Sequence, residues 1–291
     1  MRVRFSSPPA QLRRYFTTFY LVEVDVPDGG TVTDHLHPEW ANLRFHQGAT
    51  PHASNGSGAA VSGTSFPATG PSSQAVRFTI GTTRMWGVGL LPLGWARYVR
   101  AEAGTLRNAL VDGHRDPAFA QFAPLAASIF SQEPDPDAEL ARIESWFMDQ
   151  PEMSVPDEDR IIALHSAVVD PECTDVAEMS RRTGMAQRQL ERLARRHFGF
   201  SPKLLLRRQR FLRSIAHFML DPTLRWIGAM DGQYHDQAQF VRDFRQFMGM
   251  TPRQYAALPR PILSAMIHER ARFAGKPVQA LDGPDGTSPP A

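Results

Sequence analysis

The sequence of 291 residues predicts an α+β protein, with an antiparallel β domain first and an all-α domain after it. Three observations support this prediction. Short aromatic and β-branched runs, separated by turn signals, occupy residues 16–91. From about Trp95 onward, apolar residues recur at helical spacing. Part of the helical region repeats itself after 50 residues, which indicates one supersecondary unit used twice.

The β part begins with the run Tyr-Phe-Thr-Thr-Phe-Tyr-Leu-Val at 15–22, and a Pro-Asp-Gly-Gly turn follows at 27–30. Residues 47–74 are rich in Gly, Ser, Ala, Pro and Thr, which is typical either of a linker or of loops between short strands. We favour loops and short strands, because alternating runs follow. Such spacing predicts a sandwich or a barrel. Further strands are expected at 43–46, 75–80 and 85–91.

Two helices are expected between the β part and the repeat. The first covers Asp137–Met148 and places Leu140, Ile143, Trp146 and Phe147 on one face. The second opens after Pro156 with acidic residues in its first turn, which suits the helix dipole. Its apolar face is formed by Ile161, Ile162, Leu164, His165 and Val168. That face either forms a dimer contact or packs on the neighbouring domain, and the sequence leaves both open.

The repeat lies within residues 171–258. Six of the 17 positions 187–203 are identical after a shift of 50 residues, and the clearest pairs are Gln189 with Gln239 and Arg192 with Arg242. Each copy is interpreted as a short helix, a turn and a longer helix. This order is the signature of a helix-turn-helix motif, whose second helix enters the major groove of DNA.

In the first copy, Asp175 is suited to cap the short helix and Gly184 supplies the turn. A second helix is expected over about 186–197, ended by Gly199 in a left-handed conformation. A long helix, 202–220, then begins with proline at its first position.

In the second copy, residues 224–230 are predicted to form the short helix. Asp236 is expected to cap a helix over 237–248. Thr251 and Pro252 then open a last helix.

Charge is divided unevenly along the chain. Residues 1–179 carry 13 Lys/Arg and 22 Asp/Glu, a net charge of −9, whereas residues 180–260 carry 16 Lys/Arg and 5 Asp/Glu, a net charge of +11. The whole chain has a formal net charge of only +2. From Arg192 to Leu220 there are eight Arg/Lys residues and no acidic residue. A basic segment of this kind indicates contact with a polyanion.

Cysteine content and hydropathy exclude several classes of protein. Cys173 is the single cysteine, so an intrachain disulfide and a multi-cysteine metal site are both excluded. We find no signal peptide, because Glu23 and Asp25 interrupt the first apolar stretch. There is also no 18-residue apolar run, so no transmembrane helix and no membrane partner are expected. A reduced, cytoplasmic protein is the simplest interpretation.

Residues 171–258 resemble the DNA-binding domain of the AraC/XylS family of bacterial transcription regulators. The first unit matches through 176–202, most clearly in Phe-Gly-Phe-Ser-Pro at its end. The connecting helix matches through 203–211, and the second unit through 234–245 and 249–252. The resemblance implies two helix-turn-helix units on either side of a long connecting helix. It also implies a sequence-specific transcription regulator that binds duplex DNA.

The resemblance, together with the basic outer faces of the helices, assigns DNA contacts to both units. The residues expected to read base edges are Arg188, Glu191, Arg192, Gln237, Gln239 and Arg242. The residues expected to contact phosphates are Arg195, Arg196, Lys203, Arg207, Arg208 and Arg245. The two helices would reach successive major-groove segments, about one helical turn (~34 Å) apart.

Two positions depart from the family pattern. Gln233 stands where a glycine usually precedes an aromatic residue, with Gly232 one position earlier, and Ala186 stands where a serine-type cap is usual. These departures predict a shifted or strained turn in the second unit.

Residues 10–130 resemble the small cupin-like β-barrel sensor domain of some of these regulators, through residues 33–45 and 87–95. The implied partners are double-stranded DNA, a small-molecule effector and, as a further candidate, RNA polymerase. A monomer or a homodimer without a cofactor is expected. The implied domains are a sensor at 1–130, a helical linker or dimerisation segment at 131–170, the DNA-binding domain at 171–258, and a partly disordered C-terminal extension at 259–291.

The competing hypothesis is a metal-dependent cupin enzyme with an appended helical domain. His35, His37 and Glu39 imitate part of a cupin metal motif, and two His with one carboxylate can bind Fe(II), Mn or Zn. Alternation would put all three on one face of a strand, but Pro38 disturbs that strand. No second cluster follows, and no phosphate-binding loop, nucleophile elbow or dinucleotide fingerprint is found. We therefore expect no metal site and no enzymatic activity.

The C-terminal extension divides into two parts. Residues 261–274 are predicted to form a short amphipathic helix. Residues 277–291 are polar and rich in Pro and Gly, and are predicted to be disordered.

Overall fold

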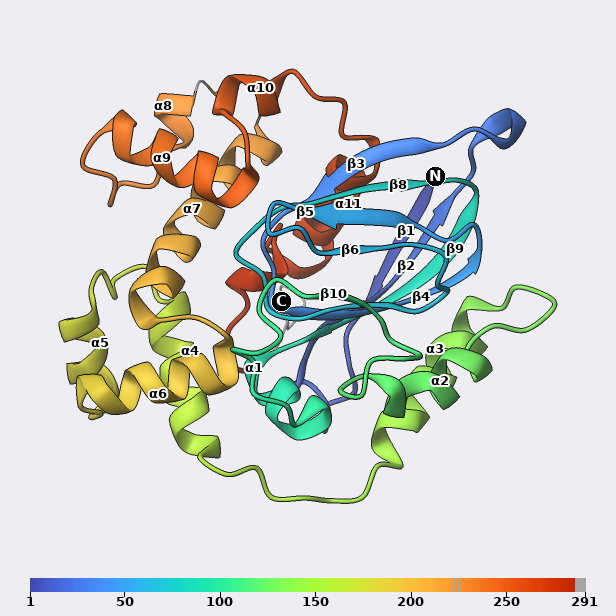
Figure 1. Cartoon of the computed structure of the whole chain (residues 1–291), viewed down its shortest axis with the longest axis horizontal. Helices are drawn as coiled ribbons and strands as arrows, with labels where there is room; N and C mark the ends of the chain where they lie inside the picture. Colours follow the sequence, from blue (N-terminus) through green and yellow to red (C-terminus); the bar gives the residue numbers. More distant parts are fainter. Residues whose placement is uncertain (222, 225, 286–291) are drawn as a thin grey trace.

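The computed structural model describes residues 1–221, 223–224 and 226–285. Strands gather on one side of the molecule and most helices on the other (Figure 1). Helices α2 and α3 cover one end of the sheets, and α4 to α10 form the helical part. The α+β class and the order of its two parts are therefore as predicted.

The β part consists of two antiparallel sheets. The six-stranded sheet has the order β1-β2-β9-β4-β7-β10, and the four-stranded sheet has the order β3-β8-β5-β6. The strands of the first sheet are β1 (Arg2–Ser6), β2 (Phe16–Val24), β9 (Thr83–Leu90), β4 (Ala41–Gly48), β7 (Pro67–Thr69) and β10 (Leu110–Asp112). Those of the second are β3 (Val32–Leu36), β8 (Val76–Ile80), β5 (His52–Asn55) and β6 (Ala60–Val61).

The Gly- and Ser-rich residues 47–74 contain β5, β6 and β7, so the interpretation as loops and short strands is confirmed. In the large sheet, Gly87 pairs with Tyr20 on one side and with Arg44 on the other. A Cβ atom at Gly87 would lie 2.0 Å from the Tyr20 ring. Glycine is thus required here, since the tyrosine ring lies across the strand.

Several short helical segments lie between or after the strands. η1 (Pro27–Gly29) lies between β2 and β3, α1 (Pro92–Gly94) and η2 (Trp95–Val99) lie between β9 and β10, and η3 (Ala120–Phe122) and α2 (Ala123–Ser128) follow β10. Helix α3 (Pro136–Met148) begins at Asp135, whose side chain accepts hydrogen bonds from two backbone N–H groups. It buries Ile143 and Phe147 against Phe16 and Phe19 of β2.

Helix α4 (Glu158–Val169) packs against helices of the same chain. Its buried residues Ile161, Leu164 and Val168 belong to the core of the helical part. The packing alternative for its apolar face is therefore the one realised. The following helices are α5 (Val176–Thr183), α6 (Gln187–Phe198), α7 (Pro202–Leu220), α8 (Trp226–Ala229), α9 (Gln237–Met248) and α10 (Pro252–Ala256).

The chain after α10 is ordered as far as it is described. Helix α11 (Pro261–Ala274) has the predicted extent and returns to the sheets, and the short helix η4 (Gln279–Leu281) follows it. The prediction of disorder from residue 277 onward is wrong for 277–282, because Val278, Ala280 and Asp282 are buried. Residues 286–291 lie outside the described part of the chain.

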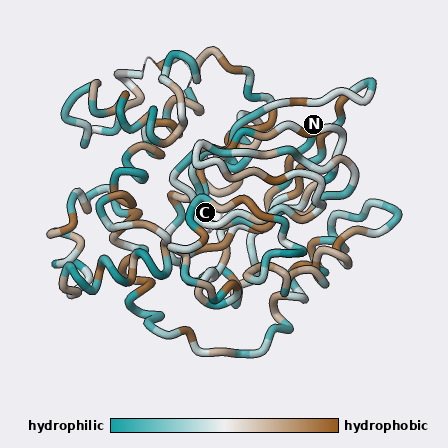
Figure 2. Tube along the Cα trace, viewed as in Figure 1, coloured by the Kyte–Doolittle hydropathy of each residue, from teal (hydrophilic) through white to brown (hydrophobic). Residues whose placement is uncertain are grey.

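Hydrophobic segments are frequent along the strands, whereas hydrophobic and hydrophilic segments alternate along the helices (Figure 2). The hydrophobic segments fit strands β2, β4 and β9, which are mostly buried, and the alternation fits helices with one face in solvent. Among the described residues, no helix is both long enough and apolar enough to cross a bilayer.

Candidate nucleic-acid interface

The first helix-turn-helix unit consists of α5 and α6. The Asp175 carboxylate accepts a hydrogen bond from the Glu178 N–H at 2.8 Å, so it caps α5 as predicted. Gly184 has φ +65°, a conformation that favours glycine, and it turns the chain between the two helices. Gly199 ends α6 in the same left-handed conformation.

The second unit consists of α8 and α9. Asp236 caps α9 through a 2.6 Å hydrogen bond from the Gln239 N–H, as predicted. The turn before it is built differently from the first, because Gly232 does not have a positive φ. Instead, the Asp231 carboxylate accepts a hydrogen bond from the Gln233 N–H and binds Arg213 of α7. The predicted departure at this turn is thus compensated by a side-chain turn.

The repeated glutamines have the same local role in both units. The Gln189 amide oxygen accepts a hydrogen bond from the Ala186 N–H at 3.1 Å, and the Gln239 oxygen accepts one from the His235 N–H at 3.3 Å. These bonds satisfy backbone donors at the start of α6 and α9, where no intrahelical partner exists. At Ala186 this return bond compensates in part for the missing serine-type cap.

The structure places most of the expected base-reading side chains on open surface. Arg188 and Arg192 of α6 are exposed, as are Gln237 and Arg242 of α9. Glu191 is half-buried and pairs with Arg195 one turn later. The amide oxygen of Gln239 is occupied by the cap, which leaves its amide nitrogen for other contacts.

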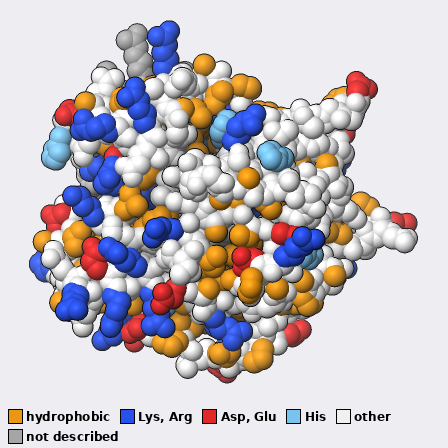
Figure 3. Space-filling model, viewed as in Figure 1, with side chains coloured by type: hydrophobic (Ala, Val, Ile, Leu, Met, Phe, Trp, Pro, Cys, Tyr) orange, Lys and Arg blue, Asp and Glu red, His pale blue; other side chains and the backbone are white. Residues whose placement is uncertain are grey.

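The residues expected to contact phosphates fall into two groups, one exposed to solvent and one held by partners within the protein. The exposed group consists of Arg195, Arg196, Lys203 and Arg245. Figure 3 shows Lys and Arg side chains concentrated over the helical part, at the left of the view, with few over the sheets. A surface of this charge suits the DNA backbone.

Arg207 belongs to the second group, because an internal partner holds it. Its guanidinium donates to the Asp243 carboxylate of α9 at 2.5 Å, and Arg210 donates to the other oxygen at 3.3 Å. The Tyr234 hydroxyl donates to the same carboxylate at 3.2 Å. Asp243 is buried, so this cluster fixes α9 on the connecting helix α7. Our sequence reasoning missed Asp243, although it is the one acidic residue of α9.

Arg208 is the clearest correction. Its side chain is fully buried and lies against the Trp40 ring, and it donates to the Ser72 carbonyl at 2.9 Å and to the Glu39 carbonyl at 3.3 Å. In this arrangement it cannot reach a phosphate. Helical periodicity places Arg208 three residues after Leu205, on the buried side of α7, and we overlooked this because charge alone suggested the surface.

The candidate metal residues do not come together. Strand β3 ends at Leu36, so His37 and Glu39 lie beyond it. The His37 ring nitrogen Nε2 hydrogen-bonds the Tyr255 hydroxyl at 2.6 Å, and Glu39 forms a buried ion pair with Arg44 at 2.7 Å. In the described ranges, no group of three or more His, Cys, Asp or Glu side chains is arranged to hold a metal ion.

Comparison with known families agrees with this geometry. Residues 179–257 match the family model described as a helix-turn-helix domain. The two units thus define a duplex-DNA-binding protein of the helix-turn-helix class. The match falls within residues 171–258, the segment that resembles the DNA-binding domain of the AraC/XylS regulators.

Comparison with solved structures finds chains of low sequence identity and low TM-score. An apo variant of ToxT from Vibrio cholerae is 11% identical, with 82% of this chain and 96% of that chain covered and a TM-score of 0.42. A 1.65 Å structure of ToxT from the same organism is 10% identical, with 83% and 98% covered and a TM-score of 0.42. Wild-type ToxT with a bound unsaturated fatty acid is 10% identical, with 82% and 94% covered and a TM-score of 0.40. A search of curated proteins finds no match.

Proposed function

We propose that α6 and α9 read bases in successive major-groove segments and that the β part controls how the two helices are placed. The observation that carries this proposal is the pair of exposed, basic recognition helices held on one connecting helix. In the proposal Arg188, Arg192 and Arg242 contact base edges, because arginine donates two parallel hydrogen bonds to guanine. Arg195, Arg196, Lys203 and Arg245 neutralise phosphates.

The β part contacts both units separately. The Ala103 N–H donates to the Arg196 carbonyl in the last turn of α6 at 2.8 Å, and the Ala75 N–H donates to the Phe247 carbonyl in the last turn of α9 at 2.7 Å. Carbonyls of a last helical turn have no partner within the helix, so these bonds satisfy them. Arg208 fixes the helix between the two units to the same surface. The relative pose of the two units therefore depends on the shape of the β part.

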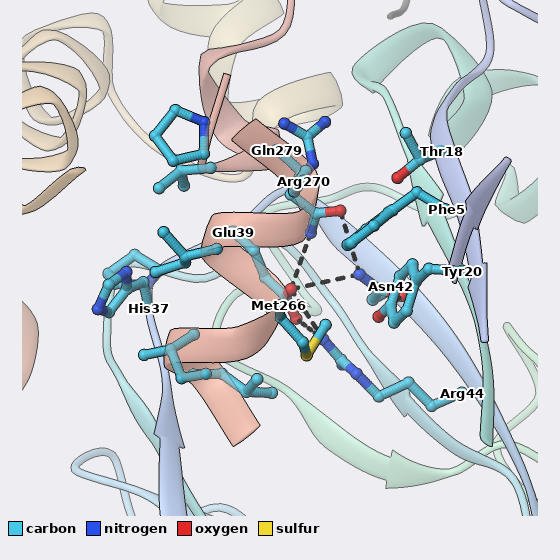
Figure 4. A pocket seen from close by; sticks show the side chains of 16 residues that line it. Phe5, Thr18, Tyr20, His37, Glu39, Asn42, Arg44, Met266, Arg270 and Gln279 are labelled. Atoms are coloured by element: carbon cyan, nitrogen blue, oxygen red, sulfur yellow. Dashed lines mark hydrogen bonds and ion pairs between the residues drawn. The ribbon is translucent and has the colours of Figure 1, made fainter. Parts of the chain in front are cut away.

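The β part also contains two cavities that suit a small-molecule effector. One is mostly apolar and lies between the two sheets; Val22, Met85, Phe78 and Ile80 are among its lining residues, with His46 as a polar group. The other is bordered by a polar cluster in which Arg44, Asn42 and Gln279 all bind Glu39 (Figure 4). An apolar wall with a few fixed polar groups is the usual form of a ligand site.

We infer that occupancy of these cavities changes the population of a DNA-competent state. An effector can change this population only if it binds the DNA-competent state and the other state with different affinity. The cavities would meet this condition if the two states differ in the cavity walls, which belong to the same β part that contacts both helix-turn-helix units. In this proposal the protein is a bacterial cytoplasmic regulator. It acts as a monomer or homodimer, and RNA polymerase is a further partner.

Selection of duplexes from a random-sequence library with the full chain tests the proposal. We expect one enriched sequence that contains two short conserved blocks, one for each recognition helix. The Arg188→Ala variant should lose the preference within one block and keep it in the other. Enrichment of no sequence, or equal binding of the enriched and a scrambled duplex, would overturn the proposal.

A further inference from the structure

After the second helix-turn-helix unit and α10, the chain returns to the β part. Residues 261–282, which we call the strap, comprise α11, a turn and η4. Helix α11 lies against β1 and β3, and η4 lies against the connecting helix α7. Figure 1 shows α11 between the strands and the helical part. The strap is therefore in contact with both halves of the molecule.

The start of the strap is held by a single buried carboxylate. One Asp34 oxygen accepts hydrogen bonds from the backbone N–H groups of Ile262 and Leu263, at 2.8 and 2.9 Å. Asp34 belongs to β3 and is fully buried. These N–H groups belong to the first turn of α11, where they have no intrahelical partner and the helix dipole favours a negative charge. A residue more than 220 positions earlier thus caps α11 from the outside.

The end of the strap is held by a second set of contacts. Gln279 donates to the Glu39 carboxylate at 2.8 Å, and the Gln209 amide of α7 donates to the Ala280 carbonyl at 2.8 Å. Arg270 and Asp282 form a buried ion pair at 2.5 Å, which closes the strap on itself. The end of the strap therefore contacts both the polar-edged cavity, through Gln279, and the connecting helix α7, through Ala280.

Apolar side chains of the strap are buried in both halves of the molecule. Ile262 belongs to a core cluster with Phe5, Tyr20 and Val22 of the sheets. Val278 and Ala280 belong instead to the cluster that contains the cores of both helix-turn-helix units. Separation of the two halves would expose both groups to water, which is unfavourable.

The strap also forms a wall of both cavities. Met266 lines the apolar and the polar-edged cavity, and Ile262 lines the apolar one. Figure 4 shows Met266 and Gln279 directed toward Glu39 and Arg44. A molecule in either cavity would therefore contact the strap directly.

We propose that the strap is an autoinhibitory contact: it holds both helix-turn-helix units on the β part, and its release increases affinity for DNA. This inference rests on the proposed function. While the strap is in place, the separation of the two units is fixed by their bonds to the β part and not by the spacing of the major groove. DNA can then bind in one of two ways. Either the fixed separation of the two units already matches the spacing of the major groove, or the bonds to the β part break, and the free energy lost with each bond weakens DNA binding.

The test compares two matched aspartate variants. Asp34→Ala removes the external cap of α11, whereas Asp135→Ala removes a cap of the same geometry from α3, where Asp135 accepts from the N–H groups of Asp137 and Ala138. Both helices begin with proline. Hydrogen exchange of residues 262–282 and anisotropy with the library-selected duplex are measured on the full chain. We expect faster exchange in the strap and about fivefold or more tighter DNA binding for Asp34→Ala alone.

Each result decides the inference. Unchanged exchange in the strap, or faster exchange with unchanged or weaker DNA binding, would overturn it. Gln279→Ala, which loosens the other end of the strap, gives the same two readouts if Asp34→Ala does not fold. If the library yields no enriched duplex, the proposed function itself fails, and the strap proposal falls with it; an enriched duplex that both aspartate variants bind equally overturns the strap alone.

Discussion

The guanidinium carbon of Arg208 lies 4.2 Å from the centre of the Trp40 ring, at the contact between the connecting helix and the β part. Burial lowers the pKa of Arg208 to about 9, so the side chain is still charged at neutral pH. A cation against an indole ring away from water is worth about 2 kcal/mol or more. The pair therefore joins the two halves of the molecule.

We predict that Arg208→Ala lowers the free energy of unfolding by about 2–4 kcal/mol, because it removes this contact and leaves a cavity. The salt dependence of DNA binding should not change, since Arg208 contacts no phosphate. Lys203→Ala is the control: it should leave the stability nearly unchanged and reduce the salt slope by about one charge. Denaturant titration and anisotropy at several salt concentrations measure both, and the opposite pattern would contradict the placement of Arg208.

Base reading by α6 gives a second prediction. Arg188→Ala and Arg192→Ala should each weaken binding to the selected duplex by about 1–3 kcal/mol, with much smaller effects on a scrambled duplex. Arg115→Ala, at an exposed residue of the β part, is the charge-matched control. Equal losses on both duplexes would show that these arginines bind phosphate only.

The Asp243 cluster gives a third prediction. Asp243→Ala leaves Arg207 and Arg210 without their anion, and we expect a loss of about 1–3 kcal/mol in stability, since Arg207 is partly exposed and water screens it. Arg207→Ala alone should cost less, because Arg210 and Tyr234 still satisfy Asp243. Thermal unfolding of the two variants measures the difference, and a larger loss for Arg207→Ala would argue against the cluster.

Buried histidines give a prediction for pH. Burial lowers the pKa of His37, His46 and His165 to about 3 and that of His197 to about 4, from an ordinary value of 6.5. Below pH 6.5 the unfolded chain binds protons that the folded protein does not, so stability is complete above 6.5 and falls as pH falls toward 3. Each histidine contributes up to about 1.4 kcal/mol per pH unit in that window.

Denaturant unfolding at pH 7, 6 and 5 measures this loss. The His165→Leu variant removes one of the four titrating groups, so its stability should decrease less steeply between pH 6.5 and 5 than that of the unchanged chain. Identical slopes for the two proteins would show that His165 is protonated in the folded state.

Sequence predicted the parts of the molecule that local chemistry specifies. The caps Asp175 and Asp236 and the left-handed Gly199 follow from preferences of single residues at helix ends, and the structure has all three. The 50-residue repeat predicted that a second unit of the same kind follows the first. Both signals can be recognised without knowing which distant residues are in contact, which explains the agreement in the helices α5 to α9 and their ends.

The contacts between the two halves could not be predicted in this way. Arg208 and Trp40 are 168 positions apart, and Asp34 caps a helix that begins at residue 261. The charge of an arginine in a basic stretch does not distinguish burial from exposure to DNA. Only the heptad-like position of Arg208, in line with Leu205 and Leu212, indicated the buried face of α7.

Hydroxyl-radical footprinting of the full chain on the selected duplex tests the central claim most directly. Two recognition helices on one connecting helix predict two protected segments on one face of the DNA, about one helical turn (~10 base pairs) apart. Arg188→Ala should weaken one segment and Arg242→Ala the other. A single protected segment, or uniform weak protection without preference for a face, would contradict the account.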